Sequence, residues 1–265
     1  MSIYGGWRRP GFGALAVALA VLPSWAASEI QDSGFLSRMD DLDSGGWYIS
    51  DFSVKKPSFR TGWSRTAVET GPEDGAVLLS LAPAPPETGK DFQGGELQWR
   101  QATRYGRYEV VMTAARGEGV ISSFFTYTGP YFDDPHNEID FEFLGRDTTK
   151  AWVNRFTDGK KLPGQWIGLG FDAAAGPHVY AFEWTEDSLA WFADGKELLR
   201  ITGKEAEIPS RPQKIYLNIW GGAEAQRDWS GFAPNGIRAV ARYYCVSYRP
   251  LGALGQQCSD LPVSQ

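Results

Sequence analysis

The sequence predicts an all-β protein in which short antiparallel strands form a sandwich or a barrel. Short runs of β-branched and aromatic residues recur along the chain, with turn signals between them. No long stretch shows the apolar periodicity of an amphipathic helix. Asp158-Gly159 and Asp194-Gly195 are strong signals for two-residue hairpin turns, which join neighbouring antiparallel strands.

Each predicted strand is a short run that is rich in Val, Ile, Thr, Tyr, Phe or Trp, the residues that pleated sheets favour. Turn residues bound several of these runs, for example Gly129-Pro130, Gly145 and Gly176-Pro177. In chain order the runs are GRYEVVMTAA (106–115), VISSFFTYTG (120–129), NEIDFEFLG (137–145), KAWVNRF (150–156), HVYAFEW (178–184), LAWFADG (189–195), KIYLNIWGG (214–222) and RYYCVSY (242–248).

Side chains within three of these runs alternate between two faces with period two, as expected for strands with one face in a core. The face expected in the core carries Phe124, Thr126, Ile139, Phe141, Phe143, Ile215, Leu217 and Ile219. The opposite face carries Ser123, Phe125, Tyr127, Glu138, Asp140, Glu142, Tyr216, Asn218 and Trp220. This mixture of aromatics, amides and acids suits a sugar, because a sugar ring offers an apolar face for stacking and hydroxyls for hydrogen bonds.

The run 137–145 places Glu138, Asp140 and Glu142 on one side of one strand. Cleavage of a glycosidic bond normally needs two carboxyl groups, which lie about 5–5.5 Å apart in enzymes that retain the anomeric configuration. Cα atoms four residues apart on a strand are about 13 Å apart, and each Glu side chain reaches about 4 Å. Glu138 and Glu142 can therefore approach this distance, especially on a curved strand.

Asp140 lies between the two glutamates and can hydrogen-bond to one of them. Neighbouring carboxyls cannot all ionise cheaply, so at least one pKa rises, as a general acid near neutral pH requires. A solvated polar face and a calcium site are the alternatives. Like charges on adjacent positions of one face disfavour the solvated polar face, because they repel each other. A calcium site is disfavoured because acids on one strand do not wrap an ion as a loop does. Catalysis is the favoured interpretation.

The chain has 265 residues and a net charge of −6, with no basic run that would indicate a nucleic-acid partner. Residues 1–26 are predicted to be a signal peptide, because Arg8 and Arg9 precede a short apolar run (Gly11 to Leu22) and small residues surround Ala26. That run is too short for a stable membrane span, which needs about 20 residues; an uncleaved anchor is the alternative. Residues 27–265 then suit one β domain.

The two cysteines, Cys245 and Cys258, both lie near the C-terminus. In an exported protein they can form a disulfide that ties the tail to the body of the domain. Two free thiols are the alternative, and we expect the disulfide.

The segment "NEIDFEFLGRDTTK" resembles the active-site strand of glycoside hydrolase family 16, whose uninterrupted pattern is Glu-x-Asp-x-Glu. The segments "GRYEVVMTAARGEGVISSFFTYTGP", "IGLGFDAAAGPHVYAFEW", "WFADGKELL" and "LNIWGG" followed by "DWSGF" look like bacterial lichenases, which are endo-β-1,3-1,4-glucanases. They also look like related glycanases that trim bacterial exopolysaccharides such as succinoglycan. The resemblance is close over residues 92–232 and loose from Trp47.

This resemblance implies a β-jelly-roll sandwich of two antiparallel sheets with a concave substrate cleft, acting with retention. By position, Glu138 matches the nucleophile, Glu142 the general acid/base and Asp140 an assisting acid. The residues that match sugar-contacting cleft positions are Glu96, Phe125, Tyr127, Asn154, Asn218 and Trp220. Of these, the period-two alternation independently places Phe125, Tyr127, Asn218 and Trp220 on the face opposite the core.

The sequence departs from lichenases at several cleft positions. Asn137 stands where Asp is common, Gln98 where Arg is usual, and Phe156 where Tyr is usual. Ser53 and Lys55 fall where lichenases place Tyr and Asn beside the substrate. We therefore expect an altered sugar pocket around these residues.

The resemblance implies a secreted or periplasmic enzyme that hydrolyses O-glycosyl bonds of a β-glucan-type polysaccharide, with a bacterial exopolysaccharide as one candidate. We expect a monomer without cofactor. We expect no metal, because Tyr244 aligns with the Asp that supports a structural calcium in lichenases. Lys55 and Lys56 suggest contact with an acidic substituent. A transglycosylase on the same scaffold and a non-catalytic carbohydrate-binding protein are the alternatives.

Overall fold

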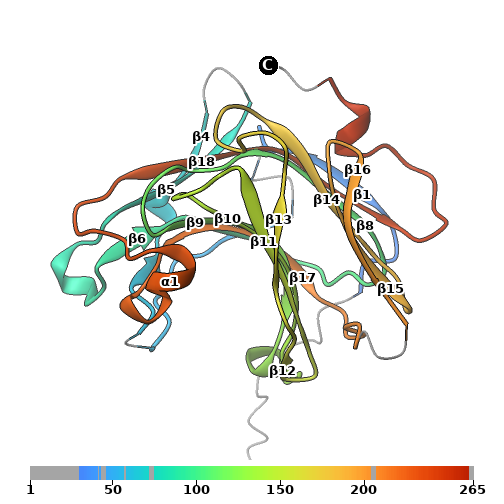
Figure 1. The fold of residues 1–265 in the computed structure, drawn as a ribbon, viewed down its shortest axis with the longest axis horizontal. Coiled ribbons are helices and arrows are strands. Elements are labelled where there is room, and N and C mark those ends of the chain that lie inside the picture. The colour runs from blue at the N-terminus through green and yellow to red at the C-terminus, as the bar shows by residue number, and fades with distance from the viewer. Residues whose placement is uncertain are drawn as a thin grey trace, which may run out of the picture.

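The structure is a computed structural model that describes residues 30–40, 42, 46–56, 58–71, 75–203 and 207–262. Two β-sheets pack face to face over most of this part of the chain (Figure 1). The signal peptide predicted for residues 1–26 lies outside the described residues. No described helix is long and apolar enough to cross a membrane.

The larger sheet contains ten strands among the described residues, in the order β16-β15-β14-β8-β18-β5-β6-β3, with β1 beside β18 and β4 beside β5. All pairs in it are antiparallel except β3 with β6. Its strands are β1 (Phe35–Arg38), β3 (Thr61–Trp63), β4 (Val68–Thr70), β5 (Val77–Pro83), β6 (Phe92–Gly94), β8 (Gly106–Thr113), β14 (His178–Trp184), β15 (Ser188–Ala193), β16 (Lys196–Thr202) and β18 (Ala239–Pro250).

The smaller sheet contains eight strands among the described residues, in the order β12-β11-β10-β9-β17-β7-β2, with β13 beside β11. These strands are β2 (Trp47–Ile49), β7 (Glu96–Trp99), β9 (Val120–Thr128), β10 (Asn137–Leu144), β11 (Lys150–Thr157), β12 (Lys160–Lys161), β13 (Gln165–Gly168) and β17 (Lys214–Gly221). Each strand run expected from the sequence forms a strand of one of the two sheets. The predicted all-β sandwich of two antiparallel sheets is therefore confirmed.

The helices of the described residues are short and lie in connections between strands. They are the 3₁₀ turns η1 (Arg65–Ala67), η2 (Pro86–Thr88), η3 (Pro130–Phe132), η5 (Glu224–Gln226) and η6 (Cys258–Asp260), and the α-helical turn α1 (Arg227–Ser230). η5 and α1 connect β17 to β18 and lie at one side of the sandwich (Figure 1).

Both predicted hairpin turns are present. Asp158 and Gly159 have φ angles of 48° and 86°, and they join β11 to β12. Asp194 and Gly195 have φ angles of 46° and 77°, and they join β15 to β16. Two successive positive φ angles match the twist of the flanking strands, which is why Asp-Gly is favoured at such turns.

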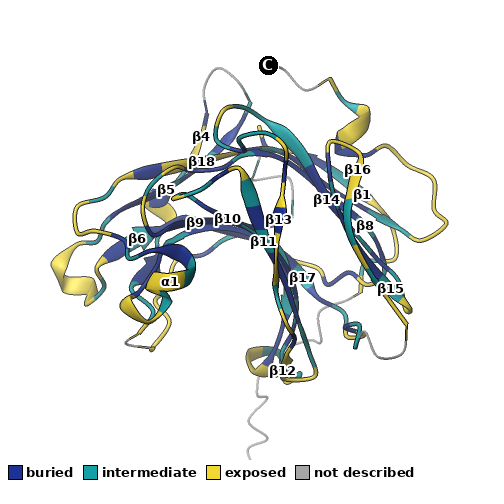
Figure 2. Cartoon of the chain, in the orientation of Figure 1, coloured by how far each residue is buried: buried dark blue, intermediate teal, exposed yellow. Residues whose placement is uncertain are grey.

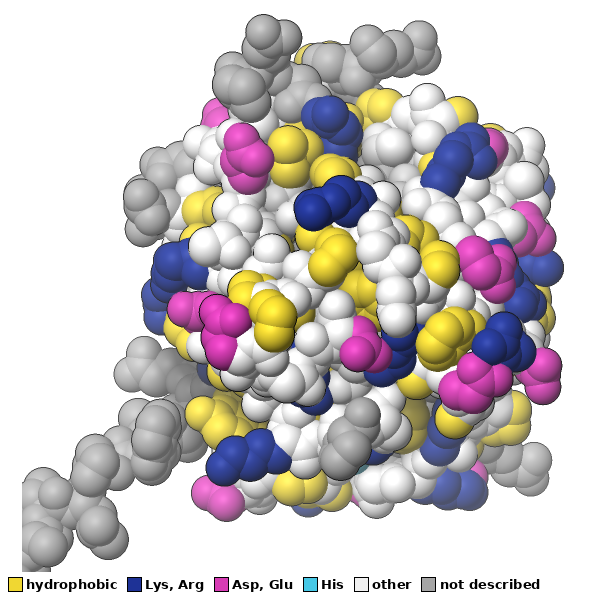
Figure 3. Space-filling model, turned by 90° about the vertical axis from the view of Figure 1, so that its left-hand side faces the viewer, with side chains coloured by type: hydrophobic (Ala, Val, Ile, Leu, Met, Phe, Trp, Pro, Cys, Tyr) yellow, Lys and Arg dark blue, Asp and Glu magenta, His cyan; other side chains and the backbone are white. Residues whose placement is uncertain are grey.

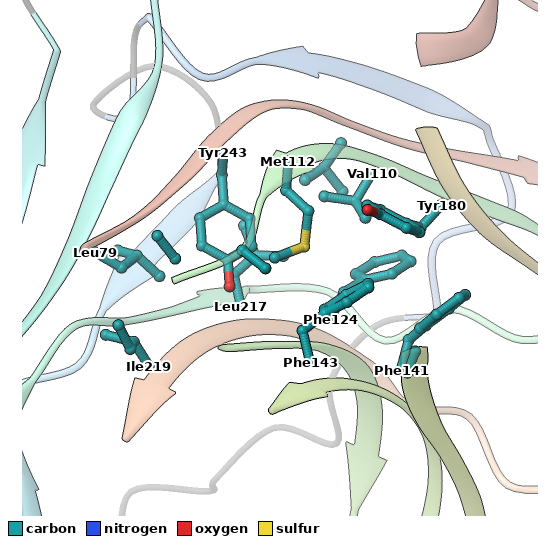
Figure 4. Packing of buried hydrophobic residues seen from close by; sticks show 14 of the residues in the cluster. Leu79, Val110, Met112, Phe124, Phe141, Phe143, Tyr180, Leu217, Ile219 and Tyr243 are labelled. Atoms are coloured by element: carbon teal, nitrogen blue, oxygen red, sulfur yellow. The ribbon is translucent and has the colours of Figure 1, made fainter. Parts of the chain in front are cut away.

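The hydrophobic core lies between the two sheets, and the buried strand residues meet there (Figures 2 and 4). Ile139, Phe141 and Phe143 of β10 are fully buried, which confirms the apolar face predicted for this strand. The Phe143 ring lies 4.5 Å from the Tyr180 ring of the opposite sheet. Each such buried side chain stabilises the fold by about 1.5–3 kcal/mol, so the apolar alternation fixes which face of β10 points outward.

Cys245 of β18 and Cys258 of η6 form a disulfide, with their Cα atoms 5.8 Å apart. Both cysteines are buried in a small apolar cluster with Val111, on the outer side of β8 and β18. The bridge ties the segment after β18 back onto the larger sheet, as the sequence led us to expect.

Charged side chains of both signs are interspersed on the face shown in Figure 3. Within that view, no extended area carries one sign of charge, as a surface for a nucleic-acid backbone would.

Candidate active site

The outward face of β10 carries the three acids that the sequence singled out. Glu138, Asp140 and Glu142 line a cavity of about 190 Å³ in the smaller sheet. The other residues that line this cavity are Phe59, Ser123, Phe125, Asn218 and Trp220. The structure thus brings together the acids and three of the predicted sugar-contact residues.

Cross-strand pairing arranges the cavity face in rows that run across the strands. Directly opposite residues of antiparallel strands point to the same face, with Cβ atoms about 4.5–5.5 Å apart. The first row is Trp152, Glu142, Ser123, Asn218 and Glu96. The second row is Asn154, Asp140, Phe125, Tyr216 and Gln98, and the third is Phe156, Glu138, Tyr127 and Lys214. Every predicted sugar-contact residue except Trp220 lies in one of these rows, and Trp220 follows Asn218 on β17 by two residues.

Two core side chains of the opposite sheet support the cavity floor from behind. Trp191 of β15 donates its indole N–H to the carbonyl oxygen of Asp140 at 3.0 Å. The Tyr243 hydroxyl of β18 lies 3.0 Å from the Ser123 carbonyl oxygen and 3.1 Å from that of Asn218. Trp191 and Tyr243 are almost fully buried, so the backbone that carries the acids rests on a rigid layer.

Burial and mutual repulsion keep the acids protonated to higher pH than usual. Burial, and to a smaller extent the charge of Glu142, raises the pKa of Glu138 to about 8, while a hydrogen bond from Asp140 acts to lower this pKa. Burial and the charge of Glu138 raise the pKa of Asp140 well above its usual value. The pKa of Glu142 is raised for the same reasons, with Asp140 as its charged neighbour. The cluster therefore loses its protons at higher pH than isolated carboxyls do, in agreement with the expected rise of at least one pKa.

Lys161 of β12 is a cation near all three carboxyls, and its charge lowers the pKa of each of them. Its side chain lies over the Phe156 ring, with Nζ 5.8 Å from the ring centroid. Sequence reasoning missed Lys161. The hairpin at Asp158-Gly159 was the available signal, because it folds β12 back beside β11.

His136 contacts the carboxylate of Glu138 through its Nε2 atom. The imidazole stacks on Phe156, with ring centroids 4.0 Å apart, and its ring meets Tyr127 edge to face. Burial lowers the pKa of His136. This arrangement holds one oxygen of Glu138 in a fixed direction. Sequence reasoning missed His136, which precedes Glu138 by two residues and lies just outside β10.

Glu96 sits at the far end of the first row and is almost fully buried. It accepts hydrogen bonds from Ser50 Oγ at 2.8 Å, Gln98 Nε2 at 3.1 Å and Asn218 Nδ2 at 3.2 Å. Burial raises the pKa of Glu96 to about 7, although the three hydrogen bonds act to lower it. Gln98, where lichenases usually have Arg, thus supplies a neutral donor to Glu96. Sequence reasoning missed Ser50, which lies just after the three-residue strand β2 and has no local pattern to mark it.

Aromatic side chains form one wall of the cavity. Trp220 is half-buried, with its ring 5.6 Å from Phe59 and 6.0 Å from Trp229. Phe125 stacks on Tyr216 at 5.0 Å. Phe59 lies in a loop and Trp229 in the helical turn α1, so strand alternation could not place either of them.

Neither Ser53 nor Lys55, which the sequence led us to expect beside the substrate, lines this cavity. Ser53 instead packs beside Gly62, where an added Cβ would lie 2.5 Å from the Ser53 Oγ. Lys55 and Lys56 are exposed. Among the described residues of this loop, Phe59 lines the cavity.

Within the part of the chain that the structure describes, no group of three or more His, Cys, Asp or Glu side chains is placed to hold a metal ion. The three acids of β10 project in one direction from a strand, and a hard cation needs oxygens from several directions.

The family profile of the glycosyl hydrolases family 16 matches residues 55–233. The chain is 38% identical to a β-glucanase of Bacillus amyloliquefaciens over 216 residues, which cover 81% of this chain and 87% of the relative. A solved lichenase (β-1,3-1,4-glucanase) from a mouse hindgut metagenome is 36% identical, with a TM-score of 0.77 over 83% of this chain and 100% of the other. A β-glucanase structure from Bacillus licheniformis is 37% identical, with a TM-score of 0.75 over 82% of this chain and 98% of the other. These matches, on top of the acid-lined cavity, show that the chain is a glycoside hydrolase and belongs to family 16.

Proposed function

We propose that the protein is an endo-β-glycanase that hydrolyses β-1,3-1,4-type glucan linkages with retention of the anomeric configuration. The carrying observation is the row geometry of β10, which points Glu138, Asp140 and Glu142 into one cavity beside Trp220 and Asn218. The substrate class is supported by relatives that are named β-glucanases and lichenase.

In the first step, a carboxylate oxygen of Glu138 attacks the anomeric carbon and forms a covalent glycosyl ester. The bond to the leaving oxygen breaks, and Glu142 gives that oxygen its proton. In the second step, Glu142, now ionised, takes a proton from water, whose oxygen attacks the anomeric carbon and releases Glu138. The raised pKa of Glu142 suits the acid role.

The residues around Glu138 help to give the three acids different roles in the reaction. His136 orients the attacking carboxylate, and Asp140 hydrogen-bonds to it. Once one of the three carboxyls is ionised, its charge disfavours ionisation of the next, so the cluster can hold one acid protonated beside an ionised nucleophile.

Substrate binding is assigned to the side of the cavity formed by β9, β17 and β7. Trp220 supplies a stacking surface for a sugar ring, and Asn218 with Glu96 supplies hydrogen-bonding groups. Phe125 and Tyr127 of β9 complete this set through their places beside the acids in the second and third rows. Asn154 of β11 lies beside Asp140 on the other side of the acid strand and is assigned a contact with the substrate there.

We further propose that the enzyme acts outside the cytoplasm, in the periplasm or the medium, on a bacterial exopolysaccharide. The predicted leader, residues 1–26, and the disulfide between Cys245 and Cys258 support the location. Lys55 and Lys56, which are exposed and do not line the cavity, support an acidic polymer.

A panel of mixed-linkage β-1,3-1,4-glucan, pure β-1,3-glucan and an acidic bacterial exopolysaccharide, read by fragment mass, tests this function. We expect internal cuts that release short oligosaccharides from mixed-linkage glucan. Products longer than the donor would identify a transglycosylase, and binding without any product would identify a carbohydrate-binding protein. Equal activity on neutral and acidic polymers, unchanged in the K55A/K56A variant, would exclude the role given to the lysines.

A further inference from the structure

The first row of the cavity continues past the acid strand onto the edge of the sheet. Trp166 of β13 is the cross-strand partner of Trp152, as Trp152 is the partner of Glu142. The same face of the sheet therefore presents, in one line, Glu96, Asn218, Ser123, Glu142, Trp152 and Trp166.

The two halves of this line differ in chemistry. Asn218 and Glu96 offer hydrogen-bonding groups on one side of Glu142, and the other side offers two indoles. Neither indole has a part in the function proposed above. Trp166 is 39% exposed, and Trp152 is half-buried. A large exposed aromatic that continues a binding cleft marks an interaction surface, because leaving it in water costs free energy.

Both indoles are held in place by their surroundings. Their ring centroids lie 5.1 Å apart at an interplanar angle of 69°. Lys150 braces Trp166, with Nζ 4.7 Å from the ring centroid, and is itself paired with Asp147 at 2.9 Å. The backbone at Gly164 lies against the edge of Trp152, where an added Cβ would come within 2.3 Å of the indole. A rigid aromatic surface loses little conformational entropy when a ligand binds.

The aromatic surface is continuous with the wall of the cavity. Trp152 lies 6.4 Å from Trp229, and Trp229 lies 6.0 Å from Trp220. A chain that passes from Asn218 over Glu142 therefore meets Trp152 and then Trp166 without leaving the cleft face.

We propose that Trp152 and Trp166 form a binding site for the leaving-group side of a β-glucan chain, one and two strands beyond the acid strand. Strands lie about 4.8 Å apart, so these indoles stand about 5 and 10 Å from β10, a span suited to the first sugar rings of the leaving segment. The C–H face of a sugar ring stacks on indole. This inference rests on the proposed function, because it takes Glu142 as the group that protonates the leaving oxygen.

The direction in which the glucan chain lies across the cleft follows from the same line of residues. The sugar that becomes bound to Glu138 is held on the Asn218 side, so the sugar that carries the leaving oxygen lies on the Trp152 side. After the leaving segment departs, the site at Trp152 and Trp166 can hold another sugar, which then reacts in place of water. In that case the new sugar's hydroxyl gives its proton to Glu142, its oxygen bonds to the anomeric carbon, and Glu138 leaves. Stronger binding there thus favours transfer over hydrolysis.

The test compares Trp166→Ala with wild type on two substrates: mixed-linkage β-1,3-1,4-glucan, and a short β-glucan oligosaccharide with a 4-nitrophenyl leaving group. We expect kcat/KM on the polymer to fall about tenfold, which corresponds to the roughly 1.4 kcal/mol of one aromatic contact. The value on the aryl substrate, whose leaving group is too short to reach Trp166, should stay within about twofold. Trp166→Phe should recover part of the loss.

The matched control is Phe192→Ala, which removes a half-exposed aromatic that lies beneath Arg107 on the other sheet. It should leave both substrates unaffected. Unchanged kcat/KM on the polymer in Trp166→Ala, or an equal loss on both substrates, would overturn the assignment. A change in oligomeric mass by light scattering would identify Trp166 as a contact between protein copies and would also overturn it. Wild type inactive on both substrates would overturn the proposed function, and this inference with it.

Discussion

Glu138→Gln is expected to lower kcat by roughly 10⁴-fold or more, because the amide cannot form the glycosyl ester. Binding of an oligosaccharide should persist, since Trp220, Asn218 and Glu96 are untouched. Steady-state rates on mixed-linkage glucan and calorimetric titration with an oligosaccharide measure the two properties separately. Glu69→Gln, a change of the same chemistry on the exposed edge strand β4, serves as the control and should keep full activity.

Glu142→Gln is expected to behave differently on substrates with good and poor leaving groups. Loss of the proton donor should cost about 10²–10⁴-fold on glucan. It should cost far less in the first step with a 4-nitrophenyl leaving group, which needs no proton. Wild-type kcat/KM on glucan should fall as the pH rises above the raised pKa of Glu142, because the acid is then ionised. In the variant this fall of kcat/KM at high pH, the basic limb of the pH profile, should disappear. A variant that keeps wild-type activity and the same limb would remove Glu142 from the acid role.

Trp191→Ala is expected to lower the free energy of unfolding by about 3–5 kcal/mol, as for other large aromatics removed from a core. Trp191 is 1% exposed. Its indole N–H also satisfies the carbonyl oxygen of Asp140, and leaving that buried acceptor without a partner adds about 1–3 kcal/mol. Total stabilities of domains are only about 5–15 kcal/mol, so the variant should unfold at much lower urea concentration.

Trp191→Phe separates the two contributions, because it keeps most of the ring volume and removes the hydrogen bond. It should lose less stability than Trp191→Ala, yet its activity should drop because the backbone at Asp140 can shift. Phe192→Ala, the next residue with its ring on the opposite face, is the control. A urea midpoint of Trp191→Ala equal to that of wild type would contradict the supporting role of this indole.

Alternation predicted the face of β10 correctly because it depends only on which residues can enter the core. Ile139, Phe141 and Phe143 are buried, so Glu138, Asp140 and Glu142 must face outward together. The same rule placed Phe125 and Asn218 in the cavity. Period two is a local property of the chain, which is why one strand at a time could be assigned.

Features that depend on register or on loop shape were beyond this rule. The line from Glu142 through Trp152 to Trp166 requires the pairing of three strands, which no single run of the sequence reveals. Phe59, which lines the cavity, was not expected there, because loop residues have no periodicity that orients them. Trp191 and Tyr243 support the cavity from the opposite sheet, a relation between segments far apart in the chain.

The anomeric configuration of the first product, followed by proton NMR immediately after enzyme addition, tests the double displacement by Glu138 and Glu142 most directly. Attack by Glu138 and then by water inverts the anomeric carbon twice. The account predicts that the β-anomer of the new reducing end appears first and that the α-anomer grows only through slow mutarotation. Initial release of the α-anomer would mean that water attacks directly, and would contradict Glu138 as nucleophile.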